Sequence, residues 1–320
     1  MEFEFNSVLI TGGAGFIGSY IAEKLIDDGI KVKVLDNLTT GKKENLEKCW
    51  GKKNFEFFEQ DLGNLQNADF LNDVDFVFHM AADPEVRTGF DKPENSFNQN
   101  IRNTFNLLQK IRHSKVKKIM FASSSSVYGD AKILPTPENY SHLLPISHYG
   151  ASKLACEALI SSFCHNYEME GIIIRPANVI GARGRHGLIW DLVHKLKNDQ
   201  SKLEILGNGK QKKSFIHITD GIKGMFHMIK NSKEKIEIFN IGSEDSIEII
   251  NVAKIVCKNM NLQEINIFTK DEMGDGRGWK GDIKKAYLDI TKLKSLGWNV
   301  ELSSIEAADL TSQEIIKEVI

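Results

Sequence analysis

A glycine-rich turn between an apolar run and an amphipathic stretch, SVLITGGAGFIGSYIAEKL (7–25), constrains this chain more than any other feature. Its glycines satisfy both G-x-G-x-x-G and the wider G-x-x-G-x-x-G spacing. Such glycines allow a tight turn and let the backbone approach a pyrophosphate at the start of a helix. The motif is weak evidence alone, but its position between a strand and a helix predicts a dinucleotide site. The cofactor contacts expected here are Gly12, Gly15, Phe16, Ile17 and Gly18.

Apolar runs and amphipathic stretches alternate through the first half of the chain. We expect strands at 7–11, 31–36, 55–61, 74–82, 116–124 and 171–179, and helices at 15–29, 95–112 and 149–167. This alternation is typical of a parallel sheet covered by helices on both faces. Since crossovers between parallel strands are right-handed, it predicts an α/β fold with a Rossmann-type doubly wound parallel sheet.

The pattern loosens beyond residue 180. HGLIWDLVHKLK and SIEIINVAKIVCKNM are typical of helices, whereas LEIL, SFIHIT and EIFNIG are typical of short strands. We therefore expect a smaller C-terminal α+β lobe, part of which returns to extend the main sheet. The expected domains are residues 1–180, which bind the cofactor, and 181–320, which bind the substrate.

Composition excludes several classes of function. The 320 residues carry a formal net charge of −2, which does not favour nucleic acid or an anionic membrane as partner. The longest apolar run is well below the roughly 18 residues of a membrane span. Four cysteines without a C-x-x-C pair indicate a reducing cytoplasm, and nine scattered histidines predict no metal site.

Asp36 ends the second expected strand, 21 residues after Gly15. A carboxylate there accepts hydrogen bonds from the adenosine ribose and repels a 2′-phosphate, which favours NAD over NADP. Lys42 and Lys43 follow closely, so NADP is disfavoured rather than excluded. Further cofactor contacts are expected after these strands, at Asn37, Asp61, Leu62, Ala81 and Ala82.

Tyr149 and Lys153 are four residues apart at the start of an expected helix, and so lie on one face. A buried ammonium beside a phenol stabilises the phenolate, so a group that normally titrates near 10 becomes a base near neutral pH. A solvated lysine beside a packed ring is the alternative. The glycine motif upstream and the serine-rich strand end FASSSSVYGD (121–130) favour the catalytic interpretation.

These motifs together resemble a known family. TGGAGFIG, Asp36, FASSSSVYG, YGASK and RPANVIGARG are similar to the extended short-chain dehydrogenase/reductases, and within them to NAD-dependent nucleotide-sugar epimerases and dehydratases, most of all UDP-glucose 4-epimerases. The resemblance covers residues 7 to about 298. It implies a UDP-sugar substrate, bound NAD and a homodimer formed through the helices near 95–112 and 149–167.

The resemblance also implies roles for individual residues. Tyr149 is the base, Lys153 holds the nicotinamide ribose, and Ser124 bonds the same sugar hydroxyl as Tyr149. Asn100, Ser123 and Pro176 line the cofactor site. The implied substrate contacts are Ser124, Ser125, Tyr149, Asn178, Leu188, Leu203, Ile205, Lys213, Phe215 and Arg277.

Two departures affect the expected diphosphate contacts. Lys213 stands where the family usually has an arginine, and it lacks the two-pronged fork of a guanidinium. Trp279 stands at a second usual arginine position before KGD. Arg277 or Lys280 could replace that cation, and we prefer Arg277.

The serine run bears on the reaction. Related 4,6-dehydratases read S-T-D-E-V-Y-G, and their Asp-Glu pair serves as acid and base, but Ser125 and Ser126 stand at those places here. We therefore expect a 4-epimerase of UDP-glucose and UDP-galactose, also accepting the N-acetylated pair if Ala286, rather than Tyr287, borders the sugar. The alternatives are a dehydratase, a decarboxylase, a UDP-glucuronate 4-epimerase or a non-catalytic NAD-binding regulator.

Overall fold

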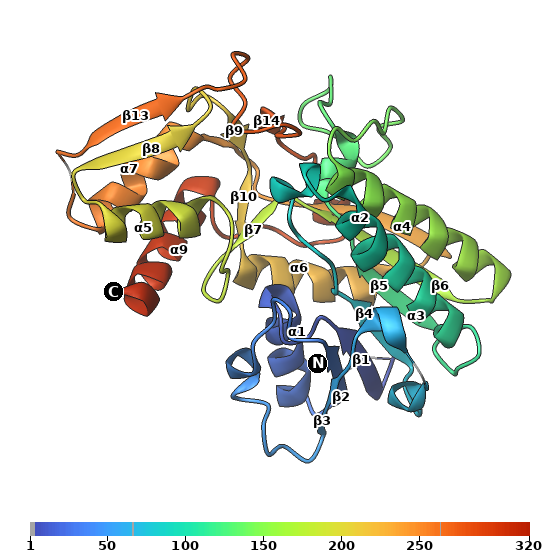
Figure 1. Ribbon diagram of the computed structural model, residues 1–320. Helices are drawn as coiled ribbons and strands as arrows, with labels where there is room; N and C mark the ends of the chain where they lie inside the picture. Colours follow the sequence, from blue (N-terminus) through green and yellow to red (C-terminus); the bar gives the residue numbers. More distant parts are fainter. Residues whose placement is uncertain (1–3, 66, 263) are drawn as a thin grey trace. The chain divides into compact units, whose positions relative to one another are not determined.

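Six apolar runs of the first half and one from the second half form a seven-stranded parallel sheet, which confirms the predicted α/β fold (Figure 1). The structure, a computed structural model, describes residues 4–65, 67–262 and 264–320. The strand order is β11-β6-β5-β4-β1-β2-β3, so the direction of winding reverses between β1 and β4, where such folds bind ligands. The strands are β1 (Ser7–Thr11), β2 (Lys31–Asp36), β3 (Phe55–Glu59), β4 (Phe76–His79), β5 (Lys118–Ala122), β6 (Glu170–Pro176) and β11 (Ile236–Ile241).

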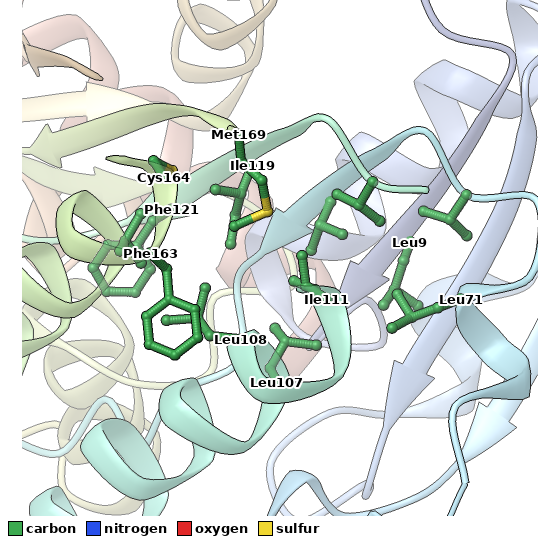
Figure 2. Packing of buried hydrophobic residues seen from close by; sticks show 14 of the residues in the cluster. Leu9, Leu71, Leu107, Leu108, Ile111, Ile119, Phe121, Phe163, Cys164 and Met169 are labelled. Carbon is green, nitrogen blue, oxygen red and sulfur yellow. The ribbon is translucent and has the colours of Figure 1, made fainter. Parts of the chain in front are cut away.

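Helices cover both faces of this sheet, which explains why its central strands are mostly apolar and buried. The main helices beside it are α1 (Phe16–Asp27), α3 (Asn103–Ile111), α4 (His148–Asn166) and α6 (Ile218–Asn231). On one face, Leu108 of α3 and Phe163 of α4 join Phe121 of β5 in a single buried cluster (Figure 2). On the other face, the Phe226 ring of α6 lies 6.2 Å from the Phe78 ring of β4.

Two expected elements differ from the structure. The predicted helix over 95–112 is interrupted, because α2 (Pro93–Asn95) leads into a π-helical segment, Ser96–Arg102, before α3 begins. The predicted strand over 171–179 is wrong as a single strand. β6 ends at Pro176, which has no amide hydrogen to donate, and β7 (Asn178–Ile180) pairs instead with β10 (Phe215–His217).

The second half forms small sheets and helices, as predicted, and EIFNIG returns to the main sheet as β11. Parallel strands β8 and β13 form one small sheet, and β9 lies between antiparallel β12 and parallel β14 in another. A separate apolar core joins α5, α7 and α9 to β8. These elements are α5 (Leu188–Asn198), β8 (Lys202–Leu206), β9 (Lys212–Lys213), β12 (Ile247–Glu248), α7 (Ile249–Asn259), β13 (Asn266–Lys270), β14 (Lys285–Ala286), α8 (Thr291–Ser295) and α9 (Ser304–Val319).

The chain forms two compact units from stretches that interleave along the sequence. Unit 1 comprises the chain up to Ser124, Ala151–Arg175 and Phe226–Phe239. Unit 2 comprises Ser125–Gly150, Pro176–Met225 and Asn240–Ile320. The single boundary expected near residue 180 stays a prediction. None of the described helices combines the length and the apolar character needed to cross a membrane.

Candidate active site

The glycine-rich turn in unit 1 is shaped partly by its own packing. Gly12 has a φ of +69°, and a Cβ there would lie 2.7 Å from the Cα of Ala81. A Cβ on Gly18 would clash with the carbonyl oxygen of Gly12. Gly15 differs, because its φ is −76° and, among the described atoms, a Cβ would approach only the Gly12 oxygen, at 3.1 Å. Protein packing therefore explains Gly12 and Gly18 better than it explains Gly15.

The first turn of α1 fits a pyrophosphate. Gly15 is the N-cap of this helix, and no side chain of the described residues caps it. The amides of Phe16, Ile17 and Gly18 belong to the first turn, where a helix offers N–H groups without an acceptor of its own. Such a turn attracts an anionic group through its amides and the helix dipole.

Asp36 lies against the same turn with 7% of its surface exposed. Its Oδ2 accepts the Ala14 amide at 2.9 Å, and its Oδ1 accepts the Leu38 amide at 2.8 Å. Burial raises the pKa of this carboxyl, and the two amides oppose the rise. Because a carboxylate oxygen has two lone pairs, each oxygen keeps room for a ribose hydroxyl. Lys43, a candidate for a 2′-phosphate, instead pairs with Glu59 at 2.8 Å.

The remaining predicted cofactor residues of unit 1 lie after β3 and β4. Asp61 accepts the side-chain amide of Asn37 at 2.5 Å, so these two predicted contacts are brought together. Leu62 is buried in the apolar cluster, while Ala81 and Ala82 are half-buried. Their roles stay predictions.

Asn100 lies in the π-helical segment and is 2% exposed. Its Oδ1 accepts the Asp83 amide at 2.8 Å, and its Nδ2 donates to Ser152 Oγ at 2.8 Å. The side chain therefore ties the loop after β4 to α4. A π turn commonly marks a functional position, which agrees with the predicted place of Asn100 beside the cofactor.

Lys153 is not the solvated lysine of the alternative interpretation. It is 2% exposed, its Nζ donates to the Ala122 carbonyl at 2.7 Å, and it lies 4.8 Å from the centre of the Phe121 ring. Burial lowers the pKa of Lys153 to about 8. Tyr149 is half-buried one turn earlier on α4. The helix thus carries a buried cation with a lowered pKa one turn from a phenol.

The serine run begins where β5 ends. The Ser123 hydroxyl donates to Glu157 Oε1 at 2.5 Å and is buried, and its contact with the cofactor stays a prediction. Ser124 is half-buried, and Ser125 opens a short 3₁₀ turn, Ser125–Tyr128. Within unit 2 the Tyr128 hydroxyl donates to Asn240 Oδ1 at 2.7 Å, which anchors the end of this turn.

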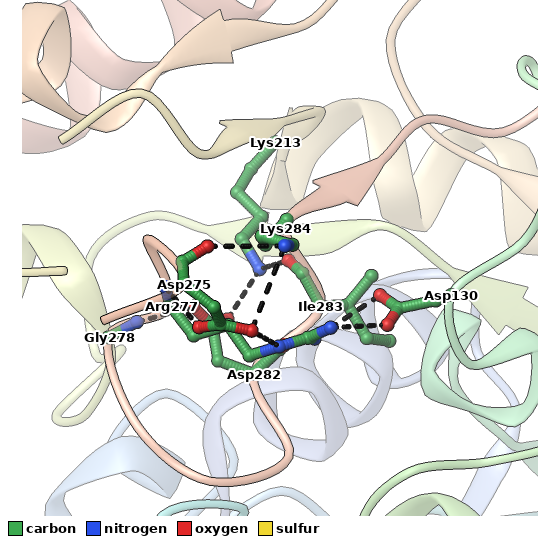
Figure 3. A network of polar contacts seen from close by, with 8 residues as sticks. All are labelled: Asp130, Lys213, Asp275, Arg277, Gly278, Asp282, Ile283 and Lys284. Atoms are coloured by element: carbon green, nitrogen blue, oxygen red, sulfur yellow. Dashed lines mark hydrogen bonds and ion pairs between the residues drawn. The ribbon is translucent and has the colours of Figure 1, made fainter. Parts of the chain in front are cut away.

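The predicted phosphate cations of unit 2 are each paired with carboxylates (Figure 3). Lys213 Nζ lies 2.7 Å from Asp282 Oδ1. Arg277 lies 2.6 Å from Asp130 Oδ2 and 2.8 Å from Asp275 Oδ2. A diphosphate bound by these cations would therefore compete with acidic side chains.

Asn178 lies close to this part of unit 2, and Trp279 lies within the same loop as Arg277. The Asn178 amide donates to the Ser214 carbonyl at 2.9 Å, one residue from Lys213. The indole Nε1 of Trp279 is buried and has no acceptor among the described residues. Pro176, predicted beside the nicotinamide, is half-buried at the end of β6.

The apolar residues expected around uracil lie mostly inside unit 2. Leu203, Ile205 and Phe215 are 0%, 2% and 3% exposed and belong to its core, against which Leu188 packs. Alternation along β8 points Leu203 and Ile205 inward, because successive side chains of a strand face opposite sides. The core accounts for these residues, and their contact with the nucleotide stays a prediction.

Three further buried polar residues of unit 1 were not predicted. Arg175 and Glu157 form a two-pronged ion pair, with Arg175 Nε to Glu157 Oε1 at 2.9 Å and Arg175 Nη2 to Glu157 Oε2 at 2.6 Å. His79 is held between Thr11 at 2.7 Å and Thr104 at 2.8 Å, and burial lowers its pKa to about 3. For Arg175 and His79 the sequence signal was a charged or polar residue within an otherwise apolar strand, as in GIIIRP; Glu157 lies on α4 and gave no such signal.

Comparison with known proteins assigns the family. Residues 8–242 match the model of the NAD dependent epimerase/dehydratase family. The chain belongs to this family. Since the glycine turn, the uncapped start of α1 and Asp36 all fit a dinucleotide, the residues present agree with the NAD dependence of the family.

Relatives of this family member agree on nucleotide-sugar chemistry but not on one reaction. A putative UDP-glucose 4-epimerase of Methanocaldococcus jannaschii is 35% identical over 92% of this chain and 93% of its own. A crystal structure of a UDP-galactose 4-epimerase is 33% identical, with a TM-score of 0.86 over 98% of this chain and all of that one.

A third relative, a UDP-glucuronic acid 4-epimerase from Bacillus cereus in complex with UDP-glucuronic acid and NAD, is 27% identical. Its TM-score is 0.87 over 98% of this chain and all of its own. Other relatives are named as decarboxylases of UDP-glucuronic acid. The chain is therefore an NAD-dependent nucleotide-sugar epimerase or dehydratase in the broad sense of the family.

Proposed function

We propose that this chain is a UDP-hexose 4-epimerase, acting on UDP-glucose and UDP-galactose and on the N-acetylated pair. One observation carries the proposal: α4 holds Tyr149 one turn before a buried Lys153, whereas serines stand where dehydratases have Asp and Glu. A serine hydroxyl neither donates nor accepts a proton readily near neutral pH, so elimination of water lacks its acid and base. Reversible oxidation at C4 does not use that Asp-Glu pair.

Each residue then has a defined task. Tyr149 takes the proton from the 4-hydroxyl of the sugar, Lys153 stabilises the phenolate, and Ser124 bonds the same hydroxyl. NAD, which the glycine turn at 12–18 and Asp36 would hold, would supply reversible hydride transfer at C4, by way of a 4-keto sugar. The nucleotide stays bound while the 4-keto sugar rotates within the site. Lys213, Asn178 and Arg277 are the proposed contacts that hold its diphosphate.

Substrate breadth rests on Ala286. This residue pairs in register with Lys213 across β14 and β9, beside a proposed phosphate contact. The neighbouring Tyr287 donates its hydroxyl to the Glu244 carbonyl, which supports Ala286 as the residue bordering the sugar. Ala286→Tyr should reduce activity on UDP-N-acetylglucosamine more than on UDP-glucose, and equal loss on both would refute this role.

A product assay tests the proposed reaction. The purified protein with NAD is incubated with UDP-glucose, UDP-N-acetylglucosamine and UDP-glucuronic acid, and products are identified by NMR and mass spectrometry. We expect mass-conserving interconversion at C4, abolished in Tyr149→Phe. Loss of water indicates a dehydratase, loss of carbon dioxide a decarboxylase, reaction of the uronic acid alone a glucuronate epimerase, and NAD binding without turnover a regulator.

We also propose a cytoplasmic homodimer formed through α3 and α4, which lie side by side in Figure 1. Phe105 of α3 is 40% exposed while its ring lies 6.0 Å from that of Phe163 on α4. Phe97, just before α3, is 52% exposed. Phe105→Glu should convert the dimer to monomers in sedimentation experiments, and an unchanged mass would contradict this interface.

A further inference from the structure

An ion pair that the proposed reaction does not use is buried where β5 and β6 end. Arg175 of β6 is 2% exposed and Glu157 of α4 is 5% exposed. The guanidinium meets the carboxylate through two hydrogen bonds, at 2.9 and 2.6 Å. Such a two-pronged pair fixes orientation as well as charge.

The same carboxylate reaches the serine run. Glu157 Oε1 accepts the Ser123 hydroxyl at 2.5 Å. One turn earlier on α4, Lys153 donates to the carbonyl of Ala122 at 2.7 Å. The last residue of β5 and the residue after it, Ala122 and Ser123, are thus bonded to two side chains one helical turn apart. These paired contacts fix the register of α4 against the strand end that carries Ser124.

The charged groups where β5 and β6 end include two cations, Lys153 and Arg175, and one carboxylate, Glu157. Glu157 is hydrogen-bonded to Arg175, and its charge raises the pKa of Lys153. The other groups beside Lys153 are Tyr149 and Cys156 on its own helix, the Phe121 ring of β5 and His79 of β4, which is neutral. Glu157 and Cys156 oppose the effect of burial, which lowers the pKa of Lys153.

We propose that Glu157 and Arg175 are positioning residues for the reaction: together they fix the strand end bearing Ser124, and they set the pH at which Lys153 loses its ammonium charge. The proposal rests on the proposed function of Tyr149 and Lys153. It predicts effects of opposite sign for the two partners. Removing Glu157 leaves Lys153 beside an uncompensated cation, and removing Arg175 leaves it beside an uncompensated carboxylate.

The pH dependence of kcat tests this prediction. The alkaline limb of the profile is the pH range in which kcat falls as pH rises. In Glu157→Gln this limb should lie about one pH unit lower than in the unchanged protein, and in Arg175→Met it should lie higher by a similar amount. The double variant should have its limb between those of the single variants. Glu170→Gln is the matched control, because Glu170 is on β6 with a side chain 53% exposed and pairs with Lys118 at 2.9 Å. Its limb should not move.

A second readout does not depend on turnover. Protein labelled with ¹³C at the lysine ε-carbons, with bound NAD, is titrated by NMR, and Lys153→Met assigns the signal. We expect the Lys153 midpoint to move down in Glu157→Gln and up in Arg175→Met. Midpoints that stay in place, or move in the same direction in both folded variants, would overturn the inference. Shifts of the expected signs in a protein that converts no UDP-sugar would instead overturn the proposed function alone.

The double variant keeps the inference testable if one of the single variants does not fold. Glu157→Gln with Arg175→Met leaves neither member of the ion pair as a lone buried charge and keeps an acceptor for Ser123, so it should fold if a single variant does not. A Lys153 midpoint in the double variant equal to that of a folded single variant would contradict the opposing roles of the two charges.

Discussion

Two clusters of cations in this molecule are built in opposite ways. In unit 1, Lys153 and Arg175 are each 2% exposed and share one carboxylate, Glu157. In unit 2, the side chains of Lys213 and Arg277 are 14% and 17% exposed. Their cluster, with Lys284, has three cations and three carboxylates, which are Asp130, Asp275 and Asp282.

The difference separates fixed charge from exchangeable charge. A buried cation with too little negative charge around it keeps a perturbed pKa and depends on geometry to stay in place. A cation at the edge of a unit that is already paired can trade one anion for another at modest cost, because it keeps a counter-charge in both states. The first arrangement suits chemistry at a fixed atom, and the second suits a ligand that comes and goes.

The largest expected effect is on kcat, which should depend on the cluster in unit 1 and hardly on the cluster in unit 2. Lys153→Met should lower kcat about 10³-fold with KM changed little, because the phenol loses the charge that makes it a base. Lys213→Met should leave kcat nearly unchanged and raise KM for the UDP-sugar. Steady-state kinetics of both variants check this, and a kcat loss of similar size in both would abolish the distinction.

The second-largest expected difference between the two clusters is in the free energy of unfolding of their variants. Glu157→Leu should lower the free energy of unfolding by about 3–5 kcal/mol, since it strands a buried guanidinium. Glu157→Leu with Arg175→Met should recover most of that loss, whereas Asp130→Leu, at a half-exposed pair, should cost at most about 1 kcal/mol. Urea unfolding followed by circular dichroism measures all three, and a double variant no better than the single one would contradict the argument.

Activity and stability should respond to alkaline pH in opposite directions. Lys153 has a pKa of about 8 in the folded protein and 10.5 ordinarily, so between these values the unfolded chain binds more protons. Stability from this group therefore rises with pH by about 3 kcal/mol across the window, while kcat falls above pH 8. Unfolding at pH 8 and 10 measures this, and Lys153→Met should remove that part of the slope.

The smallest expected effects are on the KM for the UDP-sugar, from changes at the ion pair of Arg277 and Asp130. Arg277→Gln should raise KM about tenfold through loss of a charged hydrogen bond to phosphate. Asp130→Asn removes a competing carboxylate and should lower KM by about two- to threefold. Both effects should shrink at high salt, since half-exposed charges are screened. A higher KM in Asp130→Asn would show that Asp130 helps to hold Arg277 for the ligand.

Local patterns predicted the frame of the fold and the turn between β1 and α1. The glycine turn, the end of β2 at Asp36 and the pair Tyr149 and Lys153 all depend on residues close in sequence, so spacing alone indicates them. The π-helical segment changes helical periodicity by one residue in a turn, which an apolar pattern does not resolve.

Ion pairs between residues far apart in the chain were not predicted from the sequence, for a different reason. Nothing local says that Glu157 meets Arg175, or that Lys213 meets Asp282 across 69 positions, because charge patterns do not encode partners. The apolar residues Leu203 and Ile205 show the converse limit. A family position and a core position look alike in sequence, and here the burial of both side chains agrees with the core.

The return of β11 to the main sheet limits how this protein can be divided. β11 lies at the end of the strand order, next to β6, whose GIIIRP run is almost entirely buried. A fragment ending at residue 180 would lack that last strand and would present an isoleucine-rich edge with unpaired amides and carbonyls. Such an edge recruits strands from other molecules, so the isolated cofactor-binding half should aggregate rather than serve as a portable NAD-binding module.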